Sequence, residues 1–195
     1  MINRPMLSVF IKMSVLVFLL SGCGQHGRVD FSNICSIYKA FPEWEQAARA
    51  AEHQHGIPSS LLFAVIHQES RFLADARPQR DRLFGFLPGP RFSSAYGFAQ
   101  VLDATWQNYI TQTGHQGADR AHFPDAVDFV GWYLSAIATR GRIPVTDGYR
   151  LYLAYHEGYR GYLKGSWRRK KVLINAAKRV ANRAKQYQRG MARCR

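Results

Sequence analysis

Apolar residues recur along the chain at the spacing of helices. Leu62, Val65 and Ile66 are apolar and stand at positions i, i+3 and i+4 of an expected helix, with Glu69 at i+7. This glutamate therefore shares the apolar face of the helix. A longer stripe of the same kind marks the end of the chain and consists of Val172, Leu173, Ala176, Ala177, Val180, Ala184 and Tyr187. Runs of alternating apolar and polar residues joined by a hairpin turn, the usual signal of β-strands, are nearly absent. The pattern predicts an all-α single domain of roughly six helices with few or no strands.

Prolines and glycines indicate where these helices begin and end, since proline is tolerated at a first helical position and glycine often follows a last one. Besides the final helix, we expect helices at residues 42–55, 58–69, 103–113, 124–140 and 146–157, with Gly56, Gly114 and Gly141 as stops. Residues 77–94 contain three prolines, two glycines and several arginines. We expect a long surface loop there, which contributes to a substrate wall or docks a partner.

The first 22 residues are typical of an export signal, because Arg4 and Lys12 precede a short apolar run at Val15–Leu20. That run is too short to span a bilayer alone. It ends in Leu20-Ser21-Gly22-Cys23, which resembles the bacterial lipobox, whose cysteine is lipidated and becomes the first residue of the mature protein. The alternative is an ordinary signal peptide with an incidental cysteine.

The lipobox resemblance implies a protein anchored to a membrane through Cys23, on the periplasmic side of the cell envelope. Gly24 favours the outer membrane, because in similar lipoproteins an aspartate at this position tends to retain the protein in the inner membrane. We therefore expect a signal peptide at 1–22, a lipid-anchored tether at 23–40 and a folded domain with a basic C-terminal helix at 41–195.

Cys35 and Cys194 then remain as an even pair in a chain that has left the reducing cytoplasm. We expect a disulfide that ties the start of the domain to its end; two unpaired thiols are the alternative. Closing so long a loop restrains the unfolded state, by about 4 to 5 kcal/mol if the bond is unstrained.

The net charge of +14 is concentrated at one end, because 13 of the 27 Lys and Arg residues lie between Arg160 and Arg195 and no Asp or Glu follows Glu157. Such a surface suits a polyanion. Outside the cytoplasm the expected partners are peptidoglycan, whose peptide stems carry carboxylates, and other anionic envelope polymers or lipids. A nucleic-acid partner is not expected, since it would require cytoplasmic residence. The alternative is a solvated helix face without a binding role.

A carboxyl group on an apolar helix face is costly to ionise, so desolvation is expected to raise its pKa into the range useful for proton transfer. Glu69 is the clearest such group. The structural alternative is a glutamate at a helix end that bonds a backbone group or an arginine. No His-Glu-x-x-His pattern or cysteine–histidine set occurs in the sequence, so we expect neither a metal site nor a cofactor.

Three segments carry motifs in a recognisable order: residues 66–72 read IHQESRF, residues 95–101 read AYGFAQV and residues 154–158 read AYHEG. They resemble the Glu-Ser, Ala-x-Gly-Leu-Met-Gln and Ala-Tyr-Asn-x-Gly motifs of the lytic transglycosylases related to goose-type lysozyme, the soluble-lytic-transglycosylase domain family. The resemblance spans roughly Trp44 to Tyr187 and is greatest for lipid-anchored members with two further cysteines and a basic final helix. It implies a lysozyme-like, mainly helical fold.

The resemblance also implies an activity, cleavage of the β-1,4 bond between N-acetylmuramic acid and N-acetylglucosamine of peptidoglycan, with formation of 1,6-anhydro ends. Glu69 matches the family's catalytic glutamate, which serves as both acid and base. Tyr155 is similar to a tyrosine that holds this glutamate in place; the alternative is a buried core tyrosine.

Tyr155, Ser70, Gln100 and His156 are similar to family positions that line or support the glycan cleft, so we expect them to bind substrate. Ser70 has the alternative role of capping the helix end, and Gln100 that of satisfying loop backbone groups. Phe98-Ala99 stand where the family has Leu-Met, which bears on the shape of the sugar site. His156 stands where the family has Asn, which alters a hydrogen bond or makes binding depend on pH.

Two other functions fit the same residues. One is a hydrolytic lysozyme of this fold, in which a second carboxylate positions water; the candidates are Glu157, Asp75 and Asp103. The other is a non-catalytic peptidoglycan-binding lipoprotein of an envelope machine. Trp106, Trp132 and Tyr133 lie at core spacing on expected helices, so we expect packing from them rather than sugar platforms.

Overall fold

The computed structural model describes residues 29–83, 87–91 and 93–194; the expected signal peptide and Cys23 lie outside them. Its helices are α2 (Ile34–Ala40), α3 (Pro42–His55), α4 (Ser59–Ser70), α5 (Asp103–Thr113), α6 (Phe123–Gly141), α7 (Gly148–Lys164) and α8 (Lys171–Met191). Two short strands, β1 (Arg80–Leu83) and β2 (Leu87–Arg91), and a 3-10 helix, η2 (Ser166–Arg169), complete the elements. The expected all-α fold class is confirmed, with one small hairpin added. In these described ranges no helix has both the length and the apolar character needed to cross a membrane.

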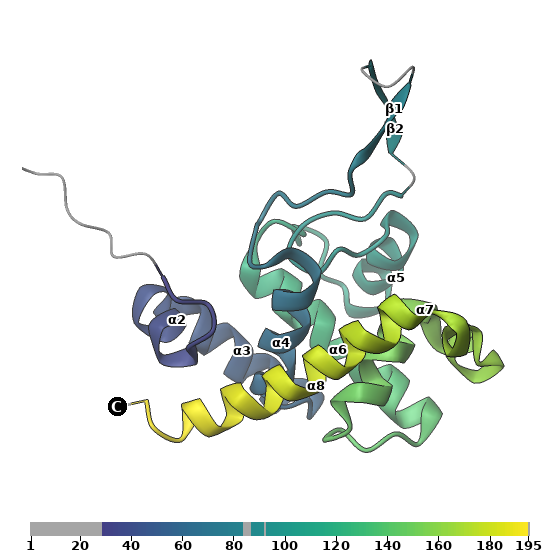
Figure 1. Ribbon diagram of the computed structural model, residues 1–195. Coiled ribbons are helices and arrows are strands. Elements are labelled where there is room, and N and C mark those ends of the chain that lie inside the picture. The colour runs from purple at the N-terminus through teal and green to yellow at the C-terminus, as the bar shows by residue number, and fades with distance from the viewer. Residues whose placement is uncertain (1–28, 84–86, 92, 195) are drawn as a thin grey trace, which may run out of the picture.

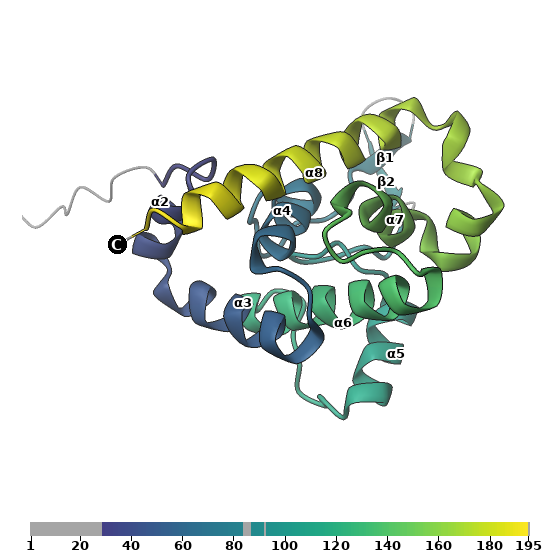
Figure 2. The same cartoon turned by 90° about the horizontal axis from the view of Figure 1, so that it is seen from below.

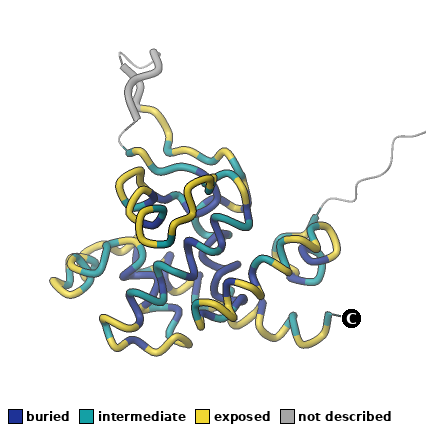
Figure 3. The backbone as a smooth tube through the Cα atoms, turned by 180° about the vertical axis from the view of Figure 1, so that it is seen from behind, coloured by how far each residue is buried: buried dark blue, intermediate teal, exposed yellow. Residues whose placement is uncertain are grey.

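The helices enclose a single core. Helices α4 and α7 lie between α8 on one side and the pair α3 and α6 on the other (Figure 2). Helix α8 runs along α4 and contacts α7, while α3 packs against α6. Buried residues concentrate where these helices face one another, and exposed residues cover the outside (Figure 3). The core therefore surrounds α4.

Helix α4 is buried around almost its whole circumference. Every residue from Ser59 to Ile66 is buried, which is the pattern of a helix enclosed by others rather than of one with a single apolar face. The Glu52 carboxylate accepts the Ser59 backbone N–H at 3.0 Å and so caps the start of the helix. Arg71 ends it in the left-handed conformation, with φ of 54°. Glu69 thus lies in the last turn of the central helix.

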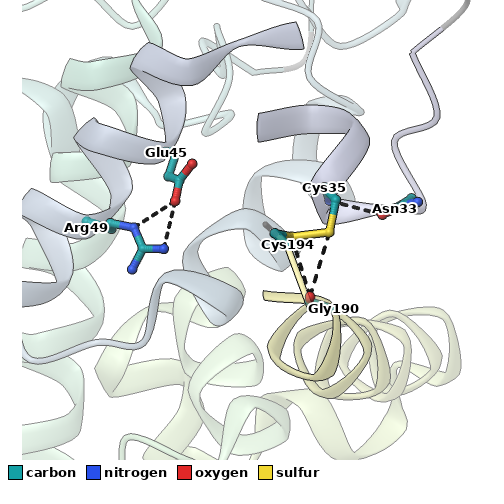
Figure 4. Close-up of a disulfide and its surroundings, with 6 residues drawn as sticks. All are labelled: Asn33, Cys35, Glu45, Arg49, Gly190 and Cys194. Atoms are coloured by element: carbon teal, nitrogen blue, oxygen red, sulfur yellow. Dashed lines mark hydrogen bonds and ion pairs between the residues drawn. A yellow bond between two sulfur atoms is a disulfide. The ribbon is translucent and has the colours of Figure 1, made fainter. Parts of the chain in front are cut away.

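The two ends of the described chain are joined covalently. A disulfide links Cys35 in α2 to Cys194 just after α8, as expected from the sequence (Figure 4). Nearby, the Tyr187 hydroxyl donates a hydrogen bond of 2.6 Å to the Phe31 carbonyl oxygen. Residues 34–40, which were expected to be part of the tether, form a helix whose isoleucines lie in the core.

The 77–94 segment contains an antiparallel hairpin where a surface loop without strands was expected. Strands β1 and β2 pair with Arg80 opposite Arg91 and Leu83 opposite Leu87. The hairpin projects from the helical body (Figure 1). Strand β2 reads LPGPR, and proline cannot donate to a strand ladder, so the usual alternating signal of a strand is missing here.

Two helix ends also differ from expectation. Gly141 is the last residue of α6 rather than its stop, and Arg142 adopts the left-handed conformation with φ of 49°. Helix α7 continues beyond the expected 146–157 range to Lys164. It does so through a break at Gly158, where φ is 68° and ψ is 157°. Such a positive φ favours glycine, because it has no Cβ atom to clash with the backbone.

Candidate active site

A cavity of about 510 Å³ lies beside the last turn of α4. All three sequence motifs line it: the first through Glu69, the second through Ala95, Gln100 and Val101, and the third through Tyr155, His156, Glu157 and Gly158. The rest of the wall consists of Ser93, Leu102, Thr105, Phe129 and Tyr133. The fold therefore gathers motifs that lie far apart in the sequence around one cavity, which we call the motif cavity.

The Glu69 carboxyl group is shielded from water although its residue borders the motif cavity. Its Oε1 atom is buried and has no hydrogen-bond partner among the described residues. Burial raises the pKa of Glu69 to about 7, and a hydrogen bond with the Tyr152 side chain offsets part of this rise. A carboxyl group with this pKa can both give and accept a proton near neutral pH. Glu69 thus has the acidity and the placement of a general acid and base.

Two tyrosines of α7 lie next to this carboxyl group. Tyr152 is buried, and its desolvation and the nearby Glu69 charge raise the pKa of its hydroxyl. Tyr155 stacks on it, with ring centroids 6.3 Å apart. The Tyr155 hydroxyl, however, donates its hydrogen bond of 2.7 Å to the Ala99 carbonyl oxygen. Tyr155 therefore ties the third motif to the second, while Tyr152 is the tyrosine whose hydroxyl lowers the pKa of the Glu69 carboxyl group.

The second motif forms a tight loop against α6 and its preceding turn. Gly97 has a φ of 78°, and a Cβ atom there would lie 2.2 Å from the Arg120 carbonyl oxygen. The Phe98 N–H donates to that same oxygen at 3.1 Å. Gln100 donates from Nε2 to the carbonyl oxygens of Ala76 at 2.8 Å and Gly97 at 2.9 Å. Gln100 consequently satisfies the loop backbone and lines the motif cavity at once.

The other expected binding residues differ in position. Ser70 is buried, and its hydroxyl donates to the Ile66 carbonyl oxygen at 3.3 Å. It is not among the residues that line the motif cavity, so its placement fits the helix-end alternative. His156 does line the cavity, with half of its side chain exposed and Nδ1 at 3.3 Å from Glu157 Oε1.

Glu157 brings a second carboxylate to the motif cavity. Its side chain is only 5% exposed, and Lys170 Nζ lies 2.7 Å and 3.0 Å from its two oxygens. Ser166 also donates a short hydrogen bond to it. Burial alone raises the pKa of Glu157, but the hydrogen bonds from Lys170, Ser166 and His156 outweigh burial, so the net shift is downward. Glu157 is thus an anion held in place, in contrast to Glu69.

The remaining candidate carboxylates lie outside the motif cavity. Asp103 forms an ion pair with Arg120, whose guanidinium donates to Asp103 Oδ1 at 2.7 Å, and Asp75 is exposed; neither residue lines the motif cavity. Over the described ranges, no group of three His, Cys, Asp or Glu side chains could hold a metal ion.

Several residues of the cavity wall were not expected from the sequence. Phe129 and Tyr133 line it although they were not expected to, and their spacing of four residues on α6 is a signal that they face the same way. Tyr133 lies edge-on to Tyr155, with centroids 5.5 Å apart. Tyr152, which lies next to Glu69, could have been found in a similar way, since it precedes Tyr155 by three residues on α7 and so shares its helix face.

The Phe98-Ala99 departure from the family motif affects the core rather than the cavity wall. Phe98 is buried and packs edge-on against Trp44 and Phe123, with centroids 5.5 Å and 5.4 Å away. Ala99 is fully buried beside it. Neither lines the motif cavity. The larger phenylalanine therefore extends an aromatic cluster beneath the loop.

The chain matches a known protein family over most of its length. The chain matches the family model described as "Transglycosylase SLT domain" over residues 11–194, a range that includes all three motifs. No curated protein and no solved structure matched the chain. The family consists of lytic transglycosylases, whose substrate is peptidoglycan. The chain belongs to the transglycosylase SLT domain family.

Proposed function

We propose that the protein is a lytic transglycosylase that cleaves the β-1,4 bond between N-acetylmuramic acid and N-acetylglucosamine and leaves 1,6-anhydro ends. The observation that carries this proposal is the meeting of the three motif segments around Glu69, whose burial raises its pKa to about 7. Family membership supports the same reaction class.

In the proposed reaction Glu69 acts twice. In its protonated form it donates a proton to the glycosidic oxygen while the bond from that oxygen to the muramyl carbon one breaks. The resulting carboxylate then takes the proton from the muramyl 6-hydroxyl as oxygen six bonds to carbon one, which returns Glu69 to its protonated form without consuming water. General acid and base catalysis of this kind is worth about 10² to 10⁴ in rate.

The surrounding residues have distinct roles in this proposal. Tyr152 positions the Glu69 carboxyl group, and Tyr155 keeps the second motif at the correct distance from it. Gln100 and His156, which line the motif cavity, bind the sugars. The ionised Glu157 offsets positive charge that develops at the muramyl ring. We also propose that lipidation of Cys23 holds the enzyme at the periplasmic face of the outer membrane, within reach of peptidoglycan.

Digestion of purified sacculi by the purified full-length protein tests this function. Mass spectrometry is expected to find products one water lighter than hydrolysed muropeptides. The matched variant Glu69→Gln keeps the size of the side chain, removes its proton chemistry and is expected to release nothing. Hydrolysed ends would instead identify a lysozyme, with Glu157 as the residue that positions water.

A second outcome addresses the wall-binding alternative. If the wild-type protein sediments with sacculi but releases no products, and Glu69→Gln sediments equally well, the protein is a binding module and the enzyme proposal fails. Radiolabelled palmitate tests the anchor separately, because Cys23→Ala is expected to abolish incorporation of the label.

A further inference from the structure

A second cavity, of about 680 Å³, adjoins the motif cavity and shares Glu69 and His156 with it. Its other lining residues include Arg169, Lys170, Lys171, Leu173, Ala176 and Arg179. Most of them come from η2 and the first half of α8, which contacts both α4 and α7. We call this space the basic cavity, because four cationic side chains border it.

Most of this positive charge has no acidic partner. Lys170 is paired with Glu157, whereas Arg169, Lys171 and Arg179 form no ion pair with any residue in the described ranges. Among the residues that the structure describes, Arg179 donates to the neutral Gln68 side chain alone, at 3.3 Å. All three cations are exposed. Since no acidic residue follows Glu157 in the sequence, nothing on α8 itself can neutralise them.

The floor of the basic cavity is apolar. Leu173 and Ala176 are buried there, and Val172 at the rim is 82% exposed. A ligand that fits both surfaces has carboxylates for the cations and small aliphatic groups for the floor. The peptide stems of peptidoglycan have this composition, because they are short, contain alanine methyl groups and carry several carboxylates.

We propose that the basic cavity binds the peptide stem of a muramyl residue at or next to the cleavage point, so that the enzyme prefers stem-bearing glycan to denuded glycan. This inference rests on the proposed function. A stem leaves the glycan from the muramyl ring, and the basic cavity begins at Glu69, where that ring is cleaved. The stem carboxylates then contact Lys171 and Arg179, and its methyl groups lie on Leu173 and Ala176.

The shape of the site favours a stem over an anionic membrane. The cations border a cavity that Glu69 also lines, so a ligand held by them lies next to the proposed catalytic carboxyl group, a position that a stem attached to the cleaved ring occupies and a membrane surface does not. An exposed ion pair contributes at most about 1 kcal/mol to binding. Two such contacts with stem carboxylates therefore account for about a tenfold preference for stem-bearing substrate.

The test compares initial cleavage rates on two forms of the same glycan strands, one with intact stems and one stripped of stems by an amidase. Wild type is expected to cleave the stem-bearing form about tenfold faster at equal low concentration. The double variant Lys171→Gln, Arg179→Gln is expected to lose this ratio while keeping the rate on denuded strands. Lys178→Gln removes an exposed charge of α8 that does not line the basic cavity, so it is expected to keep the wild-type ratio.

The outcomes are distinguishable. Equal wild-type rates on both substrates, or a double variant slowed equally on both, would overturn the stem site while leaving the transglycosylase proposal intact. Failure of wild type on both substrates would refute the proposed function itself. If the double variant keeps its stem preference but no longer binds vesicles containing phosphatidylglycerol, the basic residues serve a membrane and the inference is wrong.

Discussion

The raised pKa of Glu69 predicts a cost in stability that depends on pH. The folded protein holds the Glu69 proton up to a pKa of about 7, whereas the unfolded chain releases it near the ordinary value of 4.5. Between these values the native state binds more protons than the unfolded state, so the free energy of unfolding falls as the pH rises. The contribution is favourable in acid and is lost on passing through pH 7.

The magnitude follows from the size of the shift. A difference of 2.5 units between 4.5 and about 7, at about 1.4 kcal/mol per unit, gives a loss of about 3 kcal/mol between pH 4 and pH 8. Glu69→Gln removes the ionisation but keeps the shape. We therefore expect this variant to gain about 3 kcal/mol relative to wild type as the pH is raised from 4 to 8.

Urea unfolding at both pH values, followed by circular dichroism, measures this double difference. Effects of the amide itself cancel, because they are the same at pH 4 and pH 8. Gln107→Glu serves as a control for an added carboxylate, since Gln107 is exposed on α5 and lines neither cavity, so its change is expected to show no comparable pH dependence. A Glu69→Gln variant whose stability runs parallel to that of wild type across this range would refute the claim that Glu69 is protonated in the fold.

Three further predictions concern activity and stability. The cleavage rate is expected to fall above about pH 7, because Glu69 loses its proton there. Tyr152→Phe removes the hydroxyl that lowers the pKa of Glu69, so the alkaline limb of the pH–rate profile is expected to move to higher pH. An unmoved limb would count against the contact between Tyr152 and Glu69. Cys35→Ser is expected to lower the free energy of unfolding by about 5 kcal/mol in a denaturant titration, since the loop closed by the disulfide is long, and a loss below 1 kcal/mol would contradict this. Gly97→Ala places a Cβ atom against the Arg120 carbonyl oxygen and is therefore expected to displace the second motif. The cleavage rate in a dye-release assay is expected to fall at least tenfold. An unchanged rate would contradict this prediction.

Local signals predicted much of the fold. Proline at the start of α3 and glycine after α3 and α5 mark helix ends by restricting or freeing the backbone, and the structure has these ends where expected. Five of the seven residues expected in the apolar stripe of α8 are likewise buried, whereas Val172 is 82% exposed. Strand β2 could not be predicted in this way, because its two prolines conceal the alternation on which strand prediction depends.

The candidate site, like the fold, was predictable from the sequence only in part. Glu69 was identifiable, since an acid on an apolar helix face is unusual in any fold. The sequence could not show that Tyr152, rather than Tyr155, acts on Glu69, because this depends on how α7 is rotated against α4 and the second motif. The convergence of Arg179 with Lys171 on one cavity depends on the same tertiary arrangement. Composition shows that the chain ends in basic residues, but it does not show which of them meet.

The ion pair between Glu157 and Lys170 couples the two cavities mechanically. Glu157 belongs to the wall of the motif cavity and Lys170 to the rim of the basic cavity, and the pair holds them 2.7 Å apart. Any outward movement of η2 must therefore either pull on the residue next to the Gly158 break or separate two opposite charges. Widening one cavity therefore strains or breaks its contact with the other, so this ion pair links the two cavities that border Glu69.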